Sequence, residues 1–396
     1  SLLTLATWQL RRFIPKRRRS NQESEPEKKA FGSLTLWEKK TWLERNPDFI
    51  KTVRIISLYI FFFTVVCHLY FLFNELQYIR SVGYRQSYII AGQMSTFMRF
   101  MDIVGRMSFS AYFIYLATLP RRRHIFLPTL LFLAGSVIEL FQGLRNPIAL
   151  NLLIVVVYFM MRSRPVRFPK KMIVAMAIIV PILIFLFIRI GDSRGTEKLT
   201  ITDSFMNSLI RFFYNQGVSA RTIGNVQYYQ ELLPYKFYSF GEPIDFAKFD
   251  VLGIFTGAVR PTGQSLSVVM ETHQLSHVLS FIQSPFDYLN LGLGTGSSFI
   301  AELYADFRYL GVILGSVFYG FLMALLVRVF YGKSIIARMV MLMVTRDFLF
   351  TPRASFSNII SSFTEKTQLI AILGIFVLSF AVFYLLRTRF GKSKTA

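Results

Sequence analysis

The chain has 396 residues, of which 53% are hydrophobic and 17% are charged. This composition, with several apolar runs close to the roughly 20 residues that cross a bilayer, excludes an ordinary soluble domain. It predicts an all-α, polytopic integral membrane protein. The net charge of +23 comes from basic residues dispersed between the apolar runs, which is typical of cytoplasmic loops and not of a nucleic-acid-binding domain. No nucleic acid partner is expected. The single cysteine, Cys67, excludes an intrachain disulfide.

Residues 1–51 are interpreted as the end of an upstream span followed by a basic cytoplasmic loop. Residues 1–10 are apolar and precede a strongly basic stretch at 11–19. A cleavable signal peptide has the opposite order, with its positive region before its apolar one. The favoured interpretation is therefore the inner end of a further span, and the alternative is a short helix lying at the membrane interface.

A first transmembrane bundle of five spans is predicted over residues 52–190. Basic residues follow the second and fourth spans, as expected where the chain returns to the cytoplasm. Pro181 lies inside the fifth span without ending it, because neighbouring helices can satisfy the freed backbone groups. The five predicted spans are 52–73, 97–119, 125–142, 148–161 and 172–190.

A large external loop is predicted at 191–297, because this stretch contains no clear span. It holds two helix candidates: an amphipathic one at 201–214, expected at the membrane surface, and another at 265–282.

A second transmembrane bundle of three spans is predicted at 298–386, with a basic cytoplasmic tail at 387–396. The middle span is weak, since it contains Arg338, Arg346 and Asp347. Without it, the last span would place the basic tail outside the cell, against the usual charge bias. The prediction is therefore eight complete spans with both chain ends cytoplasmic. The last three are 298–330, 335–350 and 366–386.

Charged side chains gather toward the predicted outer face. Arg99, Asp102 and Arg106 share one face of the second span, and Glu139 and Gln142 lie at the end of the third. Charges in a span face a cavity or a partner, although a local ion-pair network is an equally good explanation. Five outer arginines also run against the positive-inside bias, and together they indicate a polyanionic ligand such as phosphate. They are Arg145, Arg211, Arg221, Arg260 and Arg353.

Three residues are candidates for a general base or a substrate contact. His273 and His277 are four residues apart in the helix candidate 265–282, so they would share a face. That spacing also permits a zinc site, but the order differs from H-E-x-x-H, and a polar helix face is the simpler explanation. Glu302 follows a glycine-rich run at the start of the sixth span. No metal or cofactor is expected, because the sequence has no D-x-D or paired-cysteine motif.

The glycine-rich run carries a family resemblance. The segment GLGTGSSFIAELYADFRYLGVILG, at 292–315, resembles Wzy-type polymerases of O-antigen and capsular oligosaccharide repeat units. The outer turn QGLRNP at 142–147 and the segment RFFYNQGVS at 211–219 fit the same family. The likeness covers most of residues 52–386, and the membrane fold resembles that of GT-C-like transferases of lipid-linked sugars. Members of the family usually carry more than eight spans, in keeping with a further span upstream.

The resemblance implies a reaction on the external, periplasmic face of a bacterial cell membrane. A growing glycan would leave polyprenyl pyrophosphate and pass to a sugar hydroxyl of an incoming lipid-linked repeat unit, without a metal. The five outer arginines would stabilise the pyrophosphate leaving group, and Glu302, His273 or His277, in that order, would accept the proton. Membrane lipids, a flippase and a chain-length regulator are the implied partners.

Two other functions remain open from the sequence. An O-antigen-ligase-like transferase would use the same arginines but a different acceptor. A flippase or transporter of lipid-linked oligosaccharide is expected to show internal repeats and charges near the bilayer midplane. The polar groups here gather at the outer side, which favours chemistry there.

Overall fold

The computed structural model describes residues 45–83, 94–162, 170–194, 206–207, 210, 214, 217–332 and 334–391. These residues form helices joined by loops, with no strand among them. The upstream span predicted at 1–10 lies outside the described residues, and so does Arg211. Of the helix candidate 201–214, the described positions 206, 207, 210 and 214 are helical.

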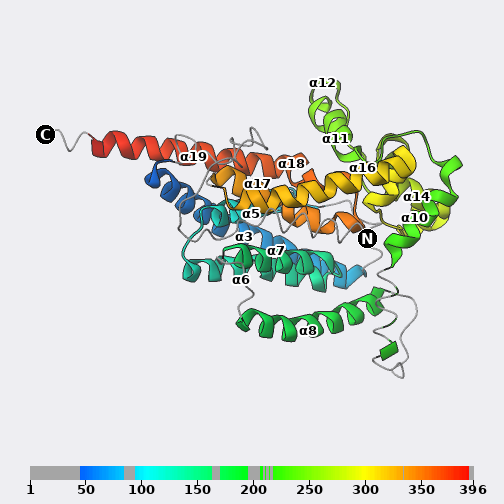
Figure 1. The fold of residues 1–396 in the computed structure, drawn as a ribbon, viewed down its shortest axis with the longest axis horizontal. Helices are drawn as coiled ribbons and strands as arrows, with labels where there is room; N and C mark the ends of the chain where they lie inside the picture. Colours follow the sequence, from blue (N-terminus) through cyan, green and yellow to red (C-terminus); the bar gives the residue numbers. More distant parts are fainter. Residues whose placement is uncertain are drawn as a thin grey trace, which may run out of the picture.

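Among the described residues, eight long helices occupy the eight ranges predicted as spans. Figure 1 shows successive long helices running in opposite directions, as expected for a chain that crosses a membrane repeatedly. The eight are α3 (Pro47–Val82), α5 (Thr96–Ala117), α6 (Arg122–Phe141), α7 (Asn146–Arg162), α8 (Lys170–Arg194), α16 (Phe299–Phe330), α17 (Ile335–Phe350) and α19 (Lys366–Gly391).

Four of these helices, α3, α6, α16 and α19, are long and apolar enough to cross a membrane. The helix α7 and the segment Met176–Ile188 of α8 are apolar but shorter. The remaining two, α5 and α17, carry the charges that the sequence places in spans; most of α17 and the C-terminal half of α5 are buried in the bundle.

The hydrophobic core lies around α5, which packs against α3, α6, α17 and α19. Every residue from Ser110 to Ala117 is buried, so this helix is covered on all sides, as expected at the centre of a bundle. The Tyr112 ring stacks on Phe132 of α6 with centroids 4.2 Å apart, and its hydroxyl bonds Thr129 Oγ1 at 2.8 Å.

Two arginines satisfy backbone carbonyls at the end of α5. Arg338 of α17 donates to Ala117 O at 2.8 Å, and Arg54 of α3 donates to Thr118 O at 2.7 Å. Cations favour this position, because the last carbonyls of a helix lack partners and carry its partial negative charge. Arg338, one of the charges that weaken the predicted span 335–350, therefore has a structural role.

The long helix α16 is kinked at Arg308, whose backbone has a φ of 56° and a ψ of −148°. This conformation is strained for a residue with a side chain. At Gly311 an added Cβ would lie 2.5 Å from Leu303 O, so only glycine allows the turns to approach this closely. The kink separates a short start, which carries Glu302 and Asp306, from the long apolar remainder.

Residues 217–297 form short helices at one end of the bundle (Figure 1). Asp306 of α16 holds this segment by accepting from Tyr238 N at 3.0 Å and Ser239 N at 2.7 Å. The helices are α10 (Val218–Tyr228), η3 (Gln230–Leu232), α11 (Gly241–Asp245), η4 (Phe246–Val251), α12 (Gly253–Thr256), α13 (Leu266–Glu271), α14 (Leu275–Gln283) and α15 (Pro285–Leu291). The connection from α17 to α19 contains η5 (Thr351–Arg353), η6 (Phe356–Ile360) and α18 (Ser361–Thr364).

Candidate functional site

A polar cavity of about 500 Å³, here called the helix-end pocket, lies between α3, α5, α6, α7, α17 and α19. It is formed by the C-terminal halves of α3, α6 and α17, the N-terminal halves of α7 and α19, and the middle of α5. This is the end of the bundle from which residues 217–297 extend (Figure 1). The polar lining residues are His68, Glu75, Asp102, Arg106, Ser108, Ser136, Glu139, Gln142, Asn151, Arg346, Ser361, Ser362, Glu365 and Gln368.

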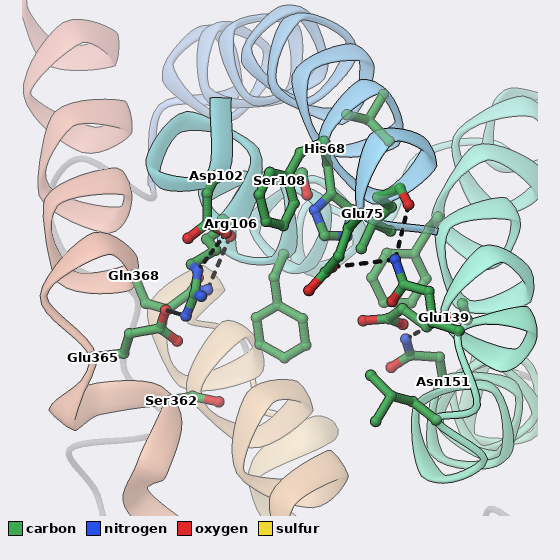
Figure 2. Close-up of a pocket in the computed structure, with 18 of the residues that line it drawn as sticks. His68, Glu75, Asp102, Arg106, Ser108, Glu139, Asn151, Ser362, Glu365 and Gln368 are labelled. Atoms are coloured by element: carbon green, nitrogen blue, oxygen red, sulfur yellow. Dashed lines mark hydrogen bonds and ion pairs between the residues drawn. The ribbon is translucent and has the colours of Figure 1, made fainter. Parts of the chain in front are cut away.

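Arg106 organises one side of the pocket (Figure 2). Its Nε donates to Asp102 Oδ1 at 2.8 Å and its Nη1 to Glu365 Oε1 at 3.5 Å. Gln368 Nε2 donates to the Arg106 carbonyl at 2.9 Å. The Asp102–Arg106 contact expected from the sequence is therefore present, and it joins α5 to the start of α19. Arg99 is exposed.

The opposite side carries Glu75, Glu139 and Asn151 (Figure 2). Gln142 Nε2 donates to Leu72 O at 2.8 Å and to Glu75 Oε2 at 3.2 Å, which ties the end of α6 to α3. Asn151 of α7 donates to Ser136 Oγ of α6 at 2.7 Å. These bonds hold the side chains of three helices around one cavity.

His68 reaches the pocket because two glycines leave room for it. A Cβ on Gly105 of α5 would lie 2.7 Å from His68 Cα, and a Cβ on Gly135 of α6 would lie 3.3 Å from its ring. Larger residues at these positions would push the helices away from α3. His68 Nδ1 is buried and has no hydrogen-bond partner among the described residues.

Arg346 brings a second guanidinium to the pocket. Its Nε donates to Asn151 Oδ1 at 3.3 Å and its Nη1 to Asp347 Oδ1 at 3.3 Å. Its charged group also lies 4.9 Å from the centre of the Phe109 ring, within the range of a cation–π interaction. Two of its five N–H donors are used in these bonds, so others are available to a ligand.

The loop of residues 351–364 is held at both ends by buried carboxylates. Asp347, 2% exposed, accepts from Ser362 N at 3.2 Å, and Asn358 Nδ2 donates to its carbonyl at 3.0 Å. This loop carries Arg353 and contributes Ser361 and Ser362 to the pocket.

Glu302 holds the other end of that loop. It is 1% exposed, and its Oε1 accepts from Ser297 Oγ at 2.7 Å. Its Oε2 accepts from Ser355 Oγ at 2.7 Å and Phe356 N at 2.8 Å. A general base must reach the proton that it removes. The geometry therefore favours a positioning role for Glu302, and its role as a base stays a prediction.

The two candidate histidines do not share a helix face. The helix expected at 265–282 is divided into α13 and α14, and His273 lies in the connection between them. Asp245, which is fully buried, accepts from His273 N at 3.1 Å and from its ring Nδ1 at 2.7 Å. His277 is in α14, where its Nδ1 bonds Tyr288 Oη at 2.8 Å. The expectation of a common face was wrong, because the bonds to Asp245 compete with continuation of the helix.

Arg260 is paired with two carboxylates. It makes a forked contact with Glu242, at 3.2 and 2.9 Å, and lies 3.8 Å from Asp250. Thr364 Oγ1 also donates to Glu242 at 3.3 Å, and Lys366 pairs with Asp250 at 2.9 Å. These contacts join residues 217–297 to the loop beside the pocket. The role of Arg260 in binding pyrophosphate stays a prediction.

The other predicted arginines are dispersed. Arg145 directly follows Leu144, a pocket-lining residue, and donates to Phe187 O of α8 at 3.3 Å. Arg353 is exposed at the end of η5, and Arg221 is exposed on α10. Arg145 thus follows a pocket-lining residue and Arg353 lies on the loop that contributes Ser361 and Ser362, whereas Arg221 lies on α10 within residues 217–297.

A family model for the O-antigen polysaccharide polymerase Wzy matches residues 29–384. The chain belongs to this family. The Wzy match covers nearly the whole chain, including every helix that lines the pocket. A search of curated proteins and a search of solved structures each gave no match.

Membership of the Wzy family, together with the apolar helices, identifies a multi-pass membrane protein with a role in polysaccharide polymerisation. Proteins of this family act on lipid-linked oligosaccharide repeat units in membranes. Within the described residues, no group of three or more His, Cys, Asp or Glu side chains is placed to hold a metal ion.

No sequence pattern indicates that the pocket residues form one site. His68 is an isolated polar residue in an apolar run, and Arg346 is one of three charges in the span predicted at 335–350; these are the signals that could have drawn attention to them. Only the packing of α3, α6 and α17 brings them to one cavity.

Proposed function

We propose that this protein polymerises oligosaccharide repeat units at the helix-end pocket, on the outer face of a bacterial cell membrane. It transfers a growing glycan from polyprenyl pyrophosphate to a sugar hydroxyl of an incoming lipid-linked repeat unit. The observation that carries the proposal is the pocket: about 500 Å³ lined by charged and amide side chains among apolar helices. Such groups are expensive within a membrane bundle and are usually retained for function.

The proposed topology has eight spans in a GT-C-like membrane fold, with both ends of the chain in the cytoplasm. It is supported by the alternating direction of the eight long helices (Figure 1). The exposed Arg121, Arg122 and Arg123 at the start of α6 and Arg387 near the end of α19 lie at the helix ends remote from the pocket. Because basic residues favour the cytoplasmic side, the pocket end faces outward.

Arginines stabilise the leaving group in this reaction. Negative charge develops on the pyrophosphate as its bond to the sugar breaks, and fixed guanidinium groups can balance that charge without a metal. Arg346 lines the pocket, Arg353 lies on the loop held by Glu302 and Asp347, and Arg145 follows a lining residue. We assign the pyrophosphate to these three.

Reconstitution of the full chain in phospholipid vesicles tests the proposal. Purified lipid-linked repeat units are added, and the products are separated on a gel. Wild type is expected to produce a ladder of extended glycans, and Arg346→Ala to reduce extension by roughly 10²-fold, the usual effect of losing one stabilising donor. Arg346→Lys restores only part of the activity, because lysine lacks the planar fork.

A matched control is Arg123→Ala, at the opposite end of α6 from Glu139, which should leave the ladder unchanged. Full ladders from the alanine variants of Arg346, Arg353 and Arg145 would show that the arginine assignment is wrong. Wild type that extends nothing but moves lipid-linked glycan across the vesicle would identify a flippase. Transfer of the glycan to an acceptor other than a repeat unit would identify a ligase.

A further inference from the structure

One side of the helix-end pocket has a buried hydrogen-bond acceptor that lacks a donor. Gln142 uses its amide N–H groups on Leu72 O and Glu75, while its Oε1 is buried with no donor among the described residues. His68 Nδ1 is also buried without a partner among the described residues, and the tautomer of the ring decides whether it donates or accepts. Buried acceptors are normally satisfied, so the unpaired Gln142 oxygen adds to the negative character of this side of the pocket.

Glu139 is the pocket carboxylate that accepts no hydrogen bond from the described residues. Asp102 and Glu365 are bonded to Arg106, and Glu75 accepts from Gln142. Glu139 lies on the same side as Glu75, with its carboxylate at the cavity (Figure 2). An ionised carboxylate has acceptor capacity on both oxygens, which is available here to a ligand.

The acceptor groups on the side of the pocket formed by α3 and α6 favour binding of a sugar over binding of a phosphate. A phosphate diester or pyrophosphate presents acceptor oxygens and negative charge, which the carboxylates of Glu75 and Glu139 repel. Sugar hydroxyls present O–H donors, which a carboxylate at the cavity can accept.

We propose that the side formed by α3 and α6 is the acceptor subsite, and that Glu139 is the catalytic base for the attacking sugar hydroxyl. This inference rests on the proposed function. The hydroxyl proton passes to the Glu139 carboxylate, and the hydroxyl oxygen forms a bond to the anomeric carbon of the donor glycan. The bond from that carbon to the phosphate oxygen breaks, and its electron pair leaves on polyprenyl pyrophosphate. Glu139 then returns its proton to water.

The positions of the charges fit this division of the pocket. Arg346, assigned above to the pyrophosphate, is close enough to Glu139 for an electrostatic interaction. It is anchored on α17 and α7 through Asp347 and Asn151, whereas Glu139 belongs to α6. The cavity therefore has a proton-accepting group and a group that stabilises the leaving anion within reach of one substrate pair.

The test compares Glu139→Gln with Glu139→Asp in the reconstituted chain-extension assay. Glutamine keeps the size of the side chain but cannot take the proton, so extension should fall by roughly 10²–10⁴-fold, the usual contribution of a general base. Aspartate keeps a base one methylene further away, and should retain clearly more activity than glutamine. Glu231→Gln, an exposed change in η3, is the control that should match wild type.

The outcomes separate this inference from the proposed function. A wild-type protein that makes no ladder contradicts the proposed function. A wild-type ladder with an equally strong ladder from Glu139→Gln overturns the assignment of Glu139 alone. An equal loss in the glutamine and aspartate variants also overturns it, because a purely structural glutamate would not distinguish them by basicity. The assignment stands if the aspartate variant extends glycan and the glutamine variant does not, at equal amounts of folded protein.

Discussion

Replacing Glu302 with glutamine should lower the stability of the fold clearly, while chain extension by the folded protein falls only modestly. The carboxylate is 1% exposed and accepts three hydrogen bonds, from Ser297, Ser355 and Phe356. Bonds to a charged group contribute roughly 1.5–3 kcal/mol each, and neutral ones roughly 0.5–1.5 kcal/mol. Glutamine keeps one acceptor oxygen, and the Ser297 hydroxyl can turn to accept from the new amide. The expected loss is about 1 kcal/mol per bond, or roughly 2–3 kcal/mol in all.

Glu302→Ala should be more damaging. It removes every acceptor and leaves the Phe356 N–H buried without a partner, which adds roughly 1–3 kcal/mol. Thermal unfolding in detergent should therefore rank wild type above Glu302→Gln and Glu302→Ala last. Amide exchange at Phe356 should quicken in the same order, because this N–H bonds the carboxylate directly.

The chain-extension assay decides whether this interpretation of Glu302 is right. A positioning residue replaced by glutamine should leave extension well above the roughly 10²–10⁴-fold loss expected on removal of a general base. If Glu302→Gln melts like wild type and yet loses activity on that scale, the positioning role is refuted. Glu302 would then be the base, and the assignment to Glu139 would fail with it.

Two further predictions concern the packing of α5 and the segment 217–297. In Gly105→Ala the new Cβ would lie 2.7 Å from His68 Cα, which forces α3 and α5 apart and should lower the free energy of unfolding by about 1–3 kcal/mol. In Gly320→Ala nothing lies within 4 Å of the new Cβ, so the free energy of unfolding should rise by up to roughly 1 kcal/mol. Equal shifts in melting temperature for Gly105→Ala and Gly320→Ala would contradict the packing argument. Burial lowers the pKa of His277 below its ordinary value, so between the two pKa values the unfolded chain binds more protons than the folded one. The free energy of unfolding should therefore decrease as the pH falls below about 6.5. In thermal unfolding, His277→Gln should reduce this pH dependence. If the pH curves of wild type and His277→Gln are parallel, the pH dependence belongs to another group.

The charges in α17 illustrate how one segment serves both the fold and the site. Arg338 bonds the end of α5, Asp347 holds the 351–364 loop, and Arg346 faces the pocket. A short, charged helix of this kind is a poor membrane span by hydropathy alone. It is stable inside the bundle because each charge has a partner there.

The sequence by itself determined where the long helices lie. Apolar runs bounded by basic clusters, such as those around α6 and α19, need only local composition to be recognised. The family likeness also depended on local motifs, and it was confirmed by the match over residues 29–384.

The site depended on tertiary structure, because its residues are distant in the sequence and meet only when particular helix faces pack. His68, Glu139 and Arg346 share a cavity because Gly105 and Gly135 let α5 and α6 approach α3. The break between α13 and α14 has the same origin, since the acceptor for His273 is Asp245, which no local pattern indicates. Periodicity predicts a helix, but it cannot show which distant carboxylate binds the backbone N–H groups of that segment, nor which pocket carboxylate is left without a donor.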